Sequence, residues 1–186
     1  MGIISFIRTL ISRRQLKDSI DDFLRRQEEY LTMTKDELLS LPDEELVQAA
    51  FSRAECKVDE FEDIQEGILS LNDVQKVIHS AYLLEMEVNN GGLCQFFANS
   101  SRFSAPFVSH SLEVLGADKH MALFDGFIIK HGINVNDLSS FESEDVDEFV
   151  EQYDRFPFDE YDDTFYSLKP IESYIAKYAR EHIEQI

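Results

Sequence analysis

Apolar residues recur every three or four positions along most of the chain, which places them on one face of an α-helix. The clearest case runs from Val74 to Val88, where the apolar face is broad. Such a face is typical of a helix at the centre of a domain. The sequence therefore predicts an all-α fold: a single compact domain of about eight helices with an amphipathic N-terminal helix. The clearest predicted helices span residues 2–31, 43–53, 73–88, 109–115, 119–131 and 170–186.

Helix start and stop signals separate these stretches. Thr34 and Glu37 form a capping box, in which the hydroxyl and the carboxylate satisfy free amides of the first turn. Pro42, followed by three acids, opens the next helix, because acids stabilise the positive end of the helix dipole. Asn72 is a similar start signal for the central helix. Two glycines mark later helix ends: Gly116 and Gly132.

The first 40 residues differ in charge from the rest of the chain. They hold seven basic and seven acidic groups, whereas residues 41–186 hold ten basic and thirty acidic groups. We therefore divide the chain into a basic-to-neutral amphipathic N-terminal helical arm, residues 1–40, and an acidic helical domain, residues 41–186. Every charged residue before Asp18 is basic, and a basic amphipathic helix can lie on a membrane surface. More often, a helix of this kind docks on the rest of its own protein or on a second copy of it.

The formal net charge of −20 arises entirely from residues 41–186. A charge of this size repels nucleic acid and anionic membranes and attracts basic partners over long range. Plain solubility is the simpler explanation of the same charge. With two cysteines, no signal-peptide pattern and no apolar run long enough to span a bilayer, the sequence favours a cytoplasmic protein with free thiols.

Residues 85–101, which we call the corner segment, interrupt the central helical pattern. Gly91 and Gly92 break the helix, and Phe96 and Phe97 follow closely. Glycine adopts positive φ without steric cost, so a helix–turn–helix corner filled by the two rings is the favoured interpretation. A ligand site is the alternative. A phosphate-binding loop is disfavoured, because no Lys or Arg accompanies the glycines and no predicted strand precedes them.

The corner segment resembles the signature of the bacterial DNA-mimic protein family. The resemblance spans roughly residues 45–135 and includes the turn at 115–117, although Leu93 stands where an aromatic residue is expected. It implies a small acidic α-helical domain that imitates DNA phosphates, occupies the DNA-binding face of a helix-turn-helix type regulator, and acts as a homodimer. The signature residues, for which we expect a structural role, are Glu87, Asn90, Gly91, Gly92, Gln95, Phe96, Phe97 and Asn99.

Two acidic tracts are the candidates for phosphate mimicry. Residues 55–66 hold six acids and one Lys, and residues 142–163 hold eleven acids and one Arg. In a helix the second tract averages about one acid per 3 Å, close to the ~3.4 Å between phosphates along one DNA strand. A solvated helix face has the same density, so this density fits both mimicry and plain solubility. The candidate acids are Glu55, Asp59, Glu60, Glu62, Asp63, Glu66, Glu142, Glu144, Asp145, Asp147, Glu148, Glu151, Asp154, Asp159, Glu160, Asp162 and Asp163.

No residue pattern predicts a catalytic, metal or cofactor site. The five histidines are scattered, and none forms an HExxH motif or stands at zinc-binding spacing from either cysteine. Cys94 lies in an apolar helix, where an inert thiol is expected. Residues 159–163 lack the glycine and the terminal Glu of a calcium-binding loop. We therefore predict a non-enzymatic protein with no catalytic residue, no metal and no cofactor.

The leading hypothesis is an acidic protein that binds a basic, DNA-binding partner in place of DNA and does not itself bind nucleic acid. One alternative is a small ligand-binding domain or hydrolase with a pocket near Asn89–Asn99. Convergence of Glu87, Gln95 and Asn99 on an open cleft would favour that alternative, whereas burial of all three with backbone partners would contradict it. A second alternative is a membrane-surface accessory protein that acts through residues 3–17.

Overall fold

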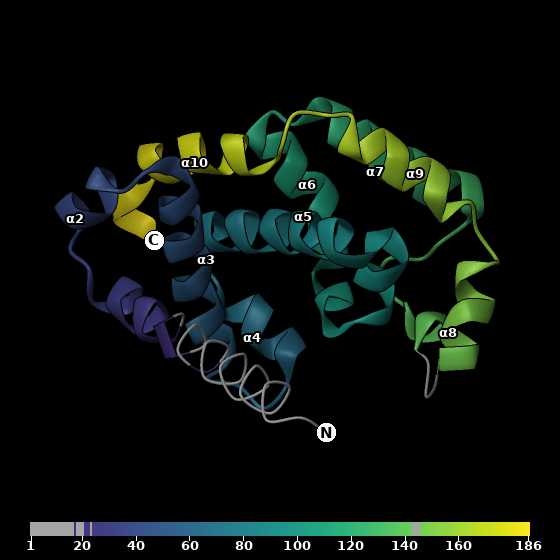
Figure 1. The fold of residues 1–186 in the computed structure, drawn as a ribbon, viewed down its shortest axis with the longest axis horizontal. Coiled ribbons are helices and arrows are strands. Elements are labelled where there is room, and N and C mark those ends of the chain that lie inside the picture. Colours follow the sequence, from purple (N-terminus) through teal and green to yellow (C-terminus); the bar gives the residue numbers. More distant parts are fainter. Residues whose placement is uncertain (1–16, 18–20, 23, 143–145) are drawn as a thin grey trace, which may run out of the picture.

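A computed structural model of the chain describes residues 17, 21–22, 24–142 and 146–186 (Figure 1). These residues form helices and no β-strand, which confirms the predicted all-α class. Most of the predicted N-terminal helix, including nearly all of residues 3–17, lies outside the described residues. The α-helices are α2 (Lys35–Ser40), α3 (Asp43–Val58), α4 (Ile64–Ser70), α5 (Asp73–Ala98), α6 (Ala105–Leu115), α7 (Asp118–His131), α8 (Val146–Tyr153), α9 (Phe158–Tyr166) and α10 (Glu172–Glu181). Three short 3-10 helices are η1 (Ser100–Ser104), η2 (Ser139–Phe141) and η3 (Ile183–Gln185).

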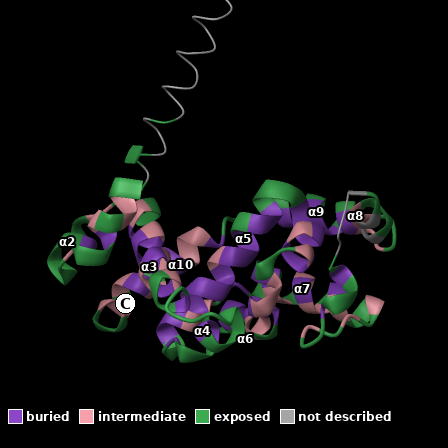
Figure 2. Ribbon diagram, turned by 90° about the horizontal axis from the view of Figure 1, so that it is seen from below, coloured by how far each residue is buried: buried purple, intermediate pink, exposed green. Residues whose placement is uncertain are grey.

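Helix α5 runs along the middle of the molecule, as its broad apolar face predicts (Figure 1). It contacts α3 and α10 towards its first half, and α6, α9 and α8 further along. Figure 2 shows that buried residues follow α5 and the sides of the helices that face it. One large apolar cluster therefore extends through the molecule from α3 to α9, and α5 is its spine.

The predicted helix starts are confirmed at two capping boxes. The Thr34 N–H donates to Glu37 Oε2 at 2.7 Å, and the Thr34 hydroxyl accepts from the Glu37 N–H. Asn72 and Gln75 make the equivalent pair of bonds at the start of α5. Helix α3 continues to Val58, beyond the predicted end at residue 53, because apolar residues on its inner face extend that far.

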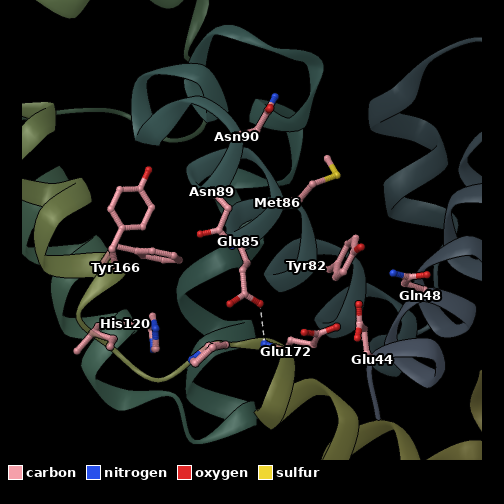
Figure 3. Close-up of a pocket in the computed structure, with 13 residues that line it drawn as sticks. Glu44, Gln48, Tyr82, Glu85, Met86, Asn89, Asn90, His120, Tyr166 and Glu172 are labelled. Atoms are coloured by element: carbon pink, nitrogen blue, oxygen red, sulfur yellow. Dashed lines mark hydrogen bonds between the residues drawn. The ribbon is translucent and has the colours of Figure 1, made fainter. Parts of the chain in front are cut away.

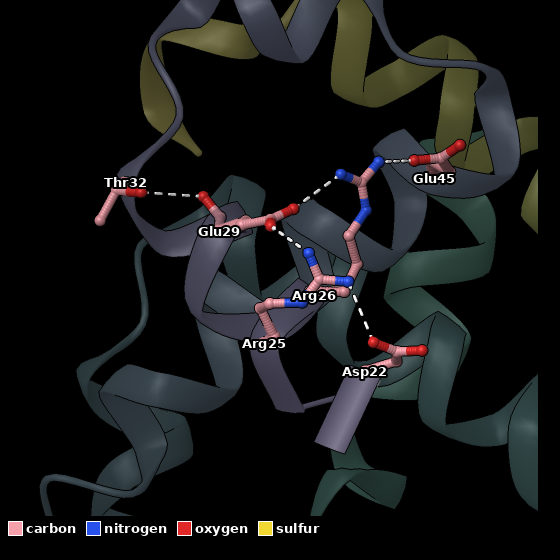
Figure 4. Close-up of polar contacts among 6 residues, drawn as sticks. All are labelled: Asp22, Arg25, Arg26, Glu29, Thr32 and Glu45. Carbon is pink, nitrogen blue, oxygen red and sulfur yellow. Dashed lines mark hydrogen bonds and ion pairs between the residues drawn. The ribbon is translucent and has the colours of Figure 1, made fainter. Parts of the chain in front are cut away.

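Residues 24–32 are helical and pack against α3 rather than apart from it. Tyr30 is buried in the main apolar cluster, and Arg53 Nε donates to the Tyr30 carbonyl at 2.8 Å. Arg26 forms ion pairs with Glu29 and, on α3, with Glu45 (Figure 4). The described end of the predicted N-terminal arm therefore belongs to the same packed body as residues 41–186.

Candidate functional site

The corner segment forms a sharp kink within α5. Gly92 has φ +83° and ψ 175°, a conformation that is essentially restricted to glycine. The carboxylate of Asp162, on α9, lies against this glycine and accepts the Leu93 N–H at 2.9 Å. Asp162 thus caps the second half of α5, because a helix start leaves free N–H groups that an acid satisfies. The predicted positive φ at one of the two glycines is confirmed.

The aromatic residues of the corner fill the space behind the kink. Phe96 and Phe97 are both fully buried. The Phe97 ring packs against Phe141, with ring centroids 5.0 Å apart, and both corner rings contact Phe124. Rings from α5, α7 and η2 therefore meet at the corner and fix the direction of the chain after it.

Glu87 is the centre of a polar cluster beside the kink. The residue is only 7% exposed, and its carboxylate accepts from Gln95 Nε2 at 2.6 Å, Asn99 Nδ2 at 3.0 Å and Ser101 Oγ at 2.8 Å. The side chain of Gln95 reaches Glu87 by crossing Gly91, where a Cβ would lie 1.9 Å from Gln95 Oε1. The two glycines therefore have different purposes: Gly92 takes the strained turn, and Gly91 leaves room for an amide.

Glu87, Gln95 and Asn99 do come together, and both amide side chains donate to the Glu87 carboxylate. Their partners are side chains rather than backbone groups, and only Glu87 of the three is buried. The observed contacts therefore match neither the arrangement that would favour a ligand site nor the one that would contradict it. Both carboxylate oxygens of Glu87 already accept hydrogen bonds from these neighbours. Among the signature residues, Asn90 is the one polar side chain that stands exposed on α5 outside this cluster.

The candidate acids of the first tract lie at the junction of α3 and α4, and we call this group the α3–α4 patch. Asp59, Glu60, Glu62 and Glu66 are exposed and form no ion pair with any described residue. Asp63 is the N-cap of α4 and accepts the Gln65 N–H at 2.7 Å.

The described candidate acids of the second tract lie on α8, on α9 and on the turn between them, apart from Glu142 at the end of η2, and we call this group the α8–α9 patch. Figure 1 shows α8 at one end of the long axis, well separated from α4. Asp147, Glu151, Asp154, Glu160 and Asp163 are exposed, and Asp159 accepts from the Tyr153 hydroxyl. Glu144, Asp145 and the side chain of Glu148 lie outside the described part of the chain.

Three more candidate acids have partners within the protein. Asp162 is 8% exposed and caps α5, so its carboxylate is not a surface charge and we do not retain it among the phosphate-mimicking acids. Burial raises its pKa, an effect that Asp159 and Asp163 reinforce. Glu55 lies 2.7 Å from His79, and Glu142 forms an ion pair with Arg102 at 2.6 Å.

One polar cluster was not anticipated from the sequence. His79 Nε2 lies 2.7 Å from Glu55 Oε2, and its Nδ1 lies 3.4 Å from Ser104 Oγ, the same three residue types as a hydrolytic triad. Ser104 is 0% exposed, so no substrate carbonyl reaches its hydroxyl, which a nucleophile requires. The cluster is therefore a structural link between α3, α5 and η1.

The cysteines differ in environment. Cys94 is buried in α5, and its burial, with the nearby charge of Asp162, raises the pKa of the thiol to about 12. Cys56 is exposed on α3. Across the described residues, no group of three or more His, Cys, Asp or Glu side chains is arranged to hold a metal ion. In the same residues, no helix is both long enough and apolar enough to cross a membrane.

These features define an acidic all-α protein in which half of the signature residues are buried and the acids of the two patches are mostly exposed. The chain belongs to the family described as DMP19-like protein, which matches residues 69–182, more than half of its length. DMP19 proteins are DNA mimics, and theirs is not a known enzyme family. No curated protein and no solved structure matches the chain significantly.

Proposed function

We propose that this protein is a non-enzymatic DNA mimic, which occupies the DNA-binding face of a basic protein through its α8–α9 patch. The observation that carries the proposal is a set of exposed carboxylates that have no cationic partner among the described residues, inside the region that matches the DNA-mimic family. The α3–α4 patch ends at residue 66, before that region begins at residue 69. Position in the family therefore favours the α8–α9 patch as the binding surface.

The α8–α9 patch also has apolar surface among its acids. Val150 is 49% exposed and stands between the acids of α8. Protein interfaces combine an apolar centre with a polar rim, whereas a face that serves solubility alone needs no apolar contact. A surface of this kind suits a protein partner whose DNA-binding face holds both basic and apolar groups.

The first experiment identifies the partner. The tagged protein captures binding proteins from a lysate of its source organism at low salt, and the retained proteins are challenged with duplex DNA. We expect a basic DNA-binding protein that duplex DNA displaces, with binding that weakens steeply as salt rises. The proposal is overturned when the retained proteins do not bind DNA, or when an excess of duplex leaves the complex intact.

The second experiment assigns the surface. A triple variant of the α8–α9 patch, Glu151→Gln, Asp154→Asn and Asp163→Asn, is compared with a triple variant of the α3–α4 patch, Asp59→Asn, Glu60→Gln and Glu62→Gln. Both variants remove three negative charges, so they are matched in net charge. Displacement of labelled DNA from the captured partner is followed by fluorescence anisotropy.

We expect the α8–α9 variant to compete about tenfold less well than the unmodified protein, because exposed ion pairs contribute up to ~1 kcal/mol each. The α3–α4 variant is expected to change competition less than threefold, through long-range attraction alone. Equal losses in the two variants would show that total charge, rather than the α8–α9 patch, drives association.

A further inference from the structure

A cavity of about 570 Å³ lies beside the corner segment (Figure 3). Residues from α3, α5, α7 and α9 line it, together with the start of α10. Its volume falls within the ~300–1,000 Å³ of typical small-molecule sites. Asn89 and Asn90 form one end of the lining, so the cavity adjoins the segment for which a ligand site was the alternative prediction.

Three carboxylates gather at the other end of the cavity. They belong to Glu44 on α3, Glu85 on α5 and Glu172 on α10 (Figure 3). No Lys or Arg is among the lining residues. The pKa of Glu172 is raised by burial and then by the charge of Glu44, and the pKa of Tyr82 is raised by burial and by all three acids. The cavity wall therefore concentrates negative charge that the lining residues do not neutralise.

One of these acids has a structural role and two do not. Glu85 accepts the N–H groups of Ile171 and Glu172, each at 2.6 Å, and so caps the start of α10. The carboxylates of Glu44 and Glu172 have no hydrogen-bond or ion-pair partner among the described residues. Two like charges held near each other destabilise the fold unless a cation lies between them.

A buried polar atom at the cavity also lacks a partner. His120, on α7, is 2% exposed and lines the cavity, and its Nδ1 has no hydrogen-bond partner among the described residues. Burial lowers the pKa of His120, so the imidazole is neutral and one of its nitrogens is an acceptor. An unpaired buried polar atom of this kind is costly.

The remaining lining suits an alkyl chain that ends in a positive charge. Tyr82, Phe165 and Tyr166 present aromatic rings, and Met86 presents a flexible apolar side chain. Aromatic faces attract cations and pack against methylene groups. Glu85 and Asn89 stand four residues apart on α5, so the acidic end and the amide end of the cavity are separated by about 6 Å along the helix.

We propose that this cavity binds a free aliphatic diamine or polyamine, with one ammonium group between Glu44 and Glu172 and the second towards Asn89. The inference is independent of DNA mimicry, because it concerns a small cation and a different surface from the α8–α9 patch. The same ammonium chemistry is present in a lysine side chain of a partner protein, and the experiment separates the two sources.

Isothermal titration calorimetry measures binding of three probes to the full chain: 1,4-diaminobutane, its neutral counterpart 1,4-butanediol, and a capped lysine, Nα-acetyl-lysine methylamide. We expect saturable binding of the diamine at one site, no binding of the diol, and weaker binding of the capped lysine. Equal binding of diamine and diol overturns the proposal, as does the absence of saturable diamine binding. Tighter binding of the capped lysine overturns the assignment to a free diamine.

Two double variants with equal net charge test the location. Glu44→Gln with Glu172→Gln is expected to weaken diamine binding about tenfold, whereas Glu60→Gln with Glu62→Gln, in the α3–α4 patch, leaves it within about twofold. Circular dichroism checks that each variant is folded. Glu44→Lys provides a further variant, because its own ammonium group would fill the acidic end and abolish diamine binding. Equal losses in the two double variants, or unchanged binding in Glu44→Lys, would contradict the proposal.

Discussion

Replacing Gly92 with alanine tests whether the kink in α5 is held by Asp162. At φ +83° and ψ 175° the backbone of Gly92 occupies a region that other residues rarely adopt, at a cost of about 1–3 kcal/mol. A Cβ would also lie 2.2 Å from Asp162 Oδ2, so the carboxylate must move. That movement breaks the 2.9 Å bond from the Leu93 N–H, and bonds to charged groups contribute about 1.5–3 kcal/mol.

The sum gives an expected loss of about 2.5–6 kcal/mol in the free energy of unfolding for Gly92→Ala. Two other glycines provide matched controls. Gly116 has φ +71°, but no atom lies within 4 Å of the position that a Cβ would take, so Gly116→Ala reports backbone strain alone, about 1–2 kcal/mol. Gly126 lies within helix α7 with open space around it, so Gly126→Ala is expected to stabilise the protein by up to ~1 kcal/mol.

Urea unfolding followed by far-ultraviolet circular dichroism measures all three variants against the unmodified protein. The expected order of stability is Gly126→Ala first, Gly116→Ala second and Gly92→Ala last. A loss in Gly92→Ala no greater than that in Gly116→Ala would refute the reasoning, because it would mean that the Asp162 carboxylate leaves its place at no cost.

Three further predictions concern buried groups. Burial raises the pKa of Asp162 above its ordinary value of 3.8, so its contribution to stability is complete below pH 3.8 and is lost as the pH rises through the folded-state pKa. Asp162→Asn keeps an oxygen acceptor and removes this loss, which urea midpoints between about pH 4 and 8 will show as a shallower decline than in the unmodified protein. Glu87→Ala leaves three donors without a buried acceptor and is expected to cost about 3–5 kcal/mol, against about 1–2 for Ser101→Ala; similar urea midpoints for the two variants would contradict this. Iodoacetamide at neutral pH is expected to modify Cys56 alone in the folded protein and also Cys94 in urea, as read by mass spectrometry, because burial raises the pKa of Cys94 to about 12.

Local signals in the sequence predicted much of the fold. The capping boxes at Thr34 and Asn72 and the helix ends at Gly116 and Gly132 all appear where expected. Each of these signals depends on contacts within about five residues, so the sequence alone contains the whole interaction. The broad apolar face from Val74 to Val88 likewise predicted the central position of α5.

The contacts that define the site span much longer separations. Asp162 meets Leu93 across 69 positions, and Glu85 meets Ile171 across 86, so neither pair leaves a periodic trace. One signal for Asp162 was nevertheless present: Phe158, Tyr161, Asp162 and Phe165 share one face of α9, and all four are buried. The number of acids in the tract gives their density but not which way each side chain faces. The spacing of Asp162 relative to the aromatic residues would have placed it on the buried face of the helix.

The division between internal and exposed acids has a consequence for how family membership informs function. The polar atoms of Glu87, Gln95 and Asn99 bind one another, and Gly91 and Gly92 make room for internal side chains, so this part of the signature specifies a corner. Motif-based resemblance ended near residue 135, whereas the family match continues to residue 182 and includes α8 and α9. Since the carboxylate of Glu87 and the amides of Gln95 and Asn99 are used inside this cluster, we expect partner choice to depend on exposed residues outside it. Two family members with the same corner and different α8–α9 charges would therefore share a fold without sharing a partner.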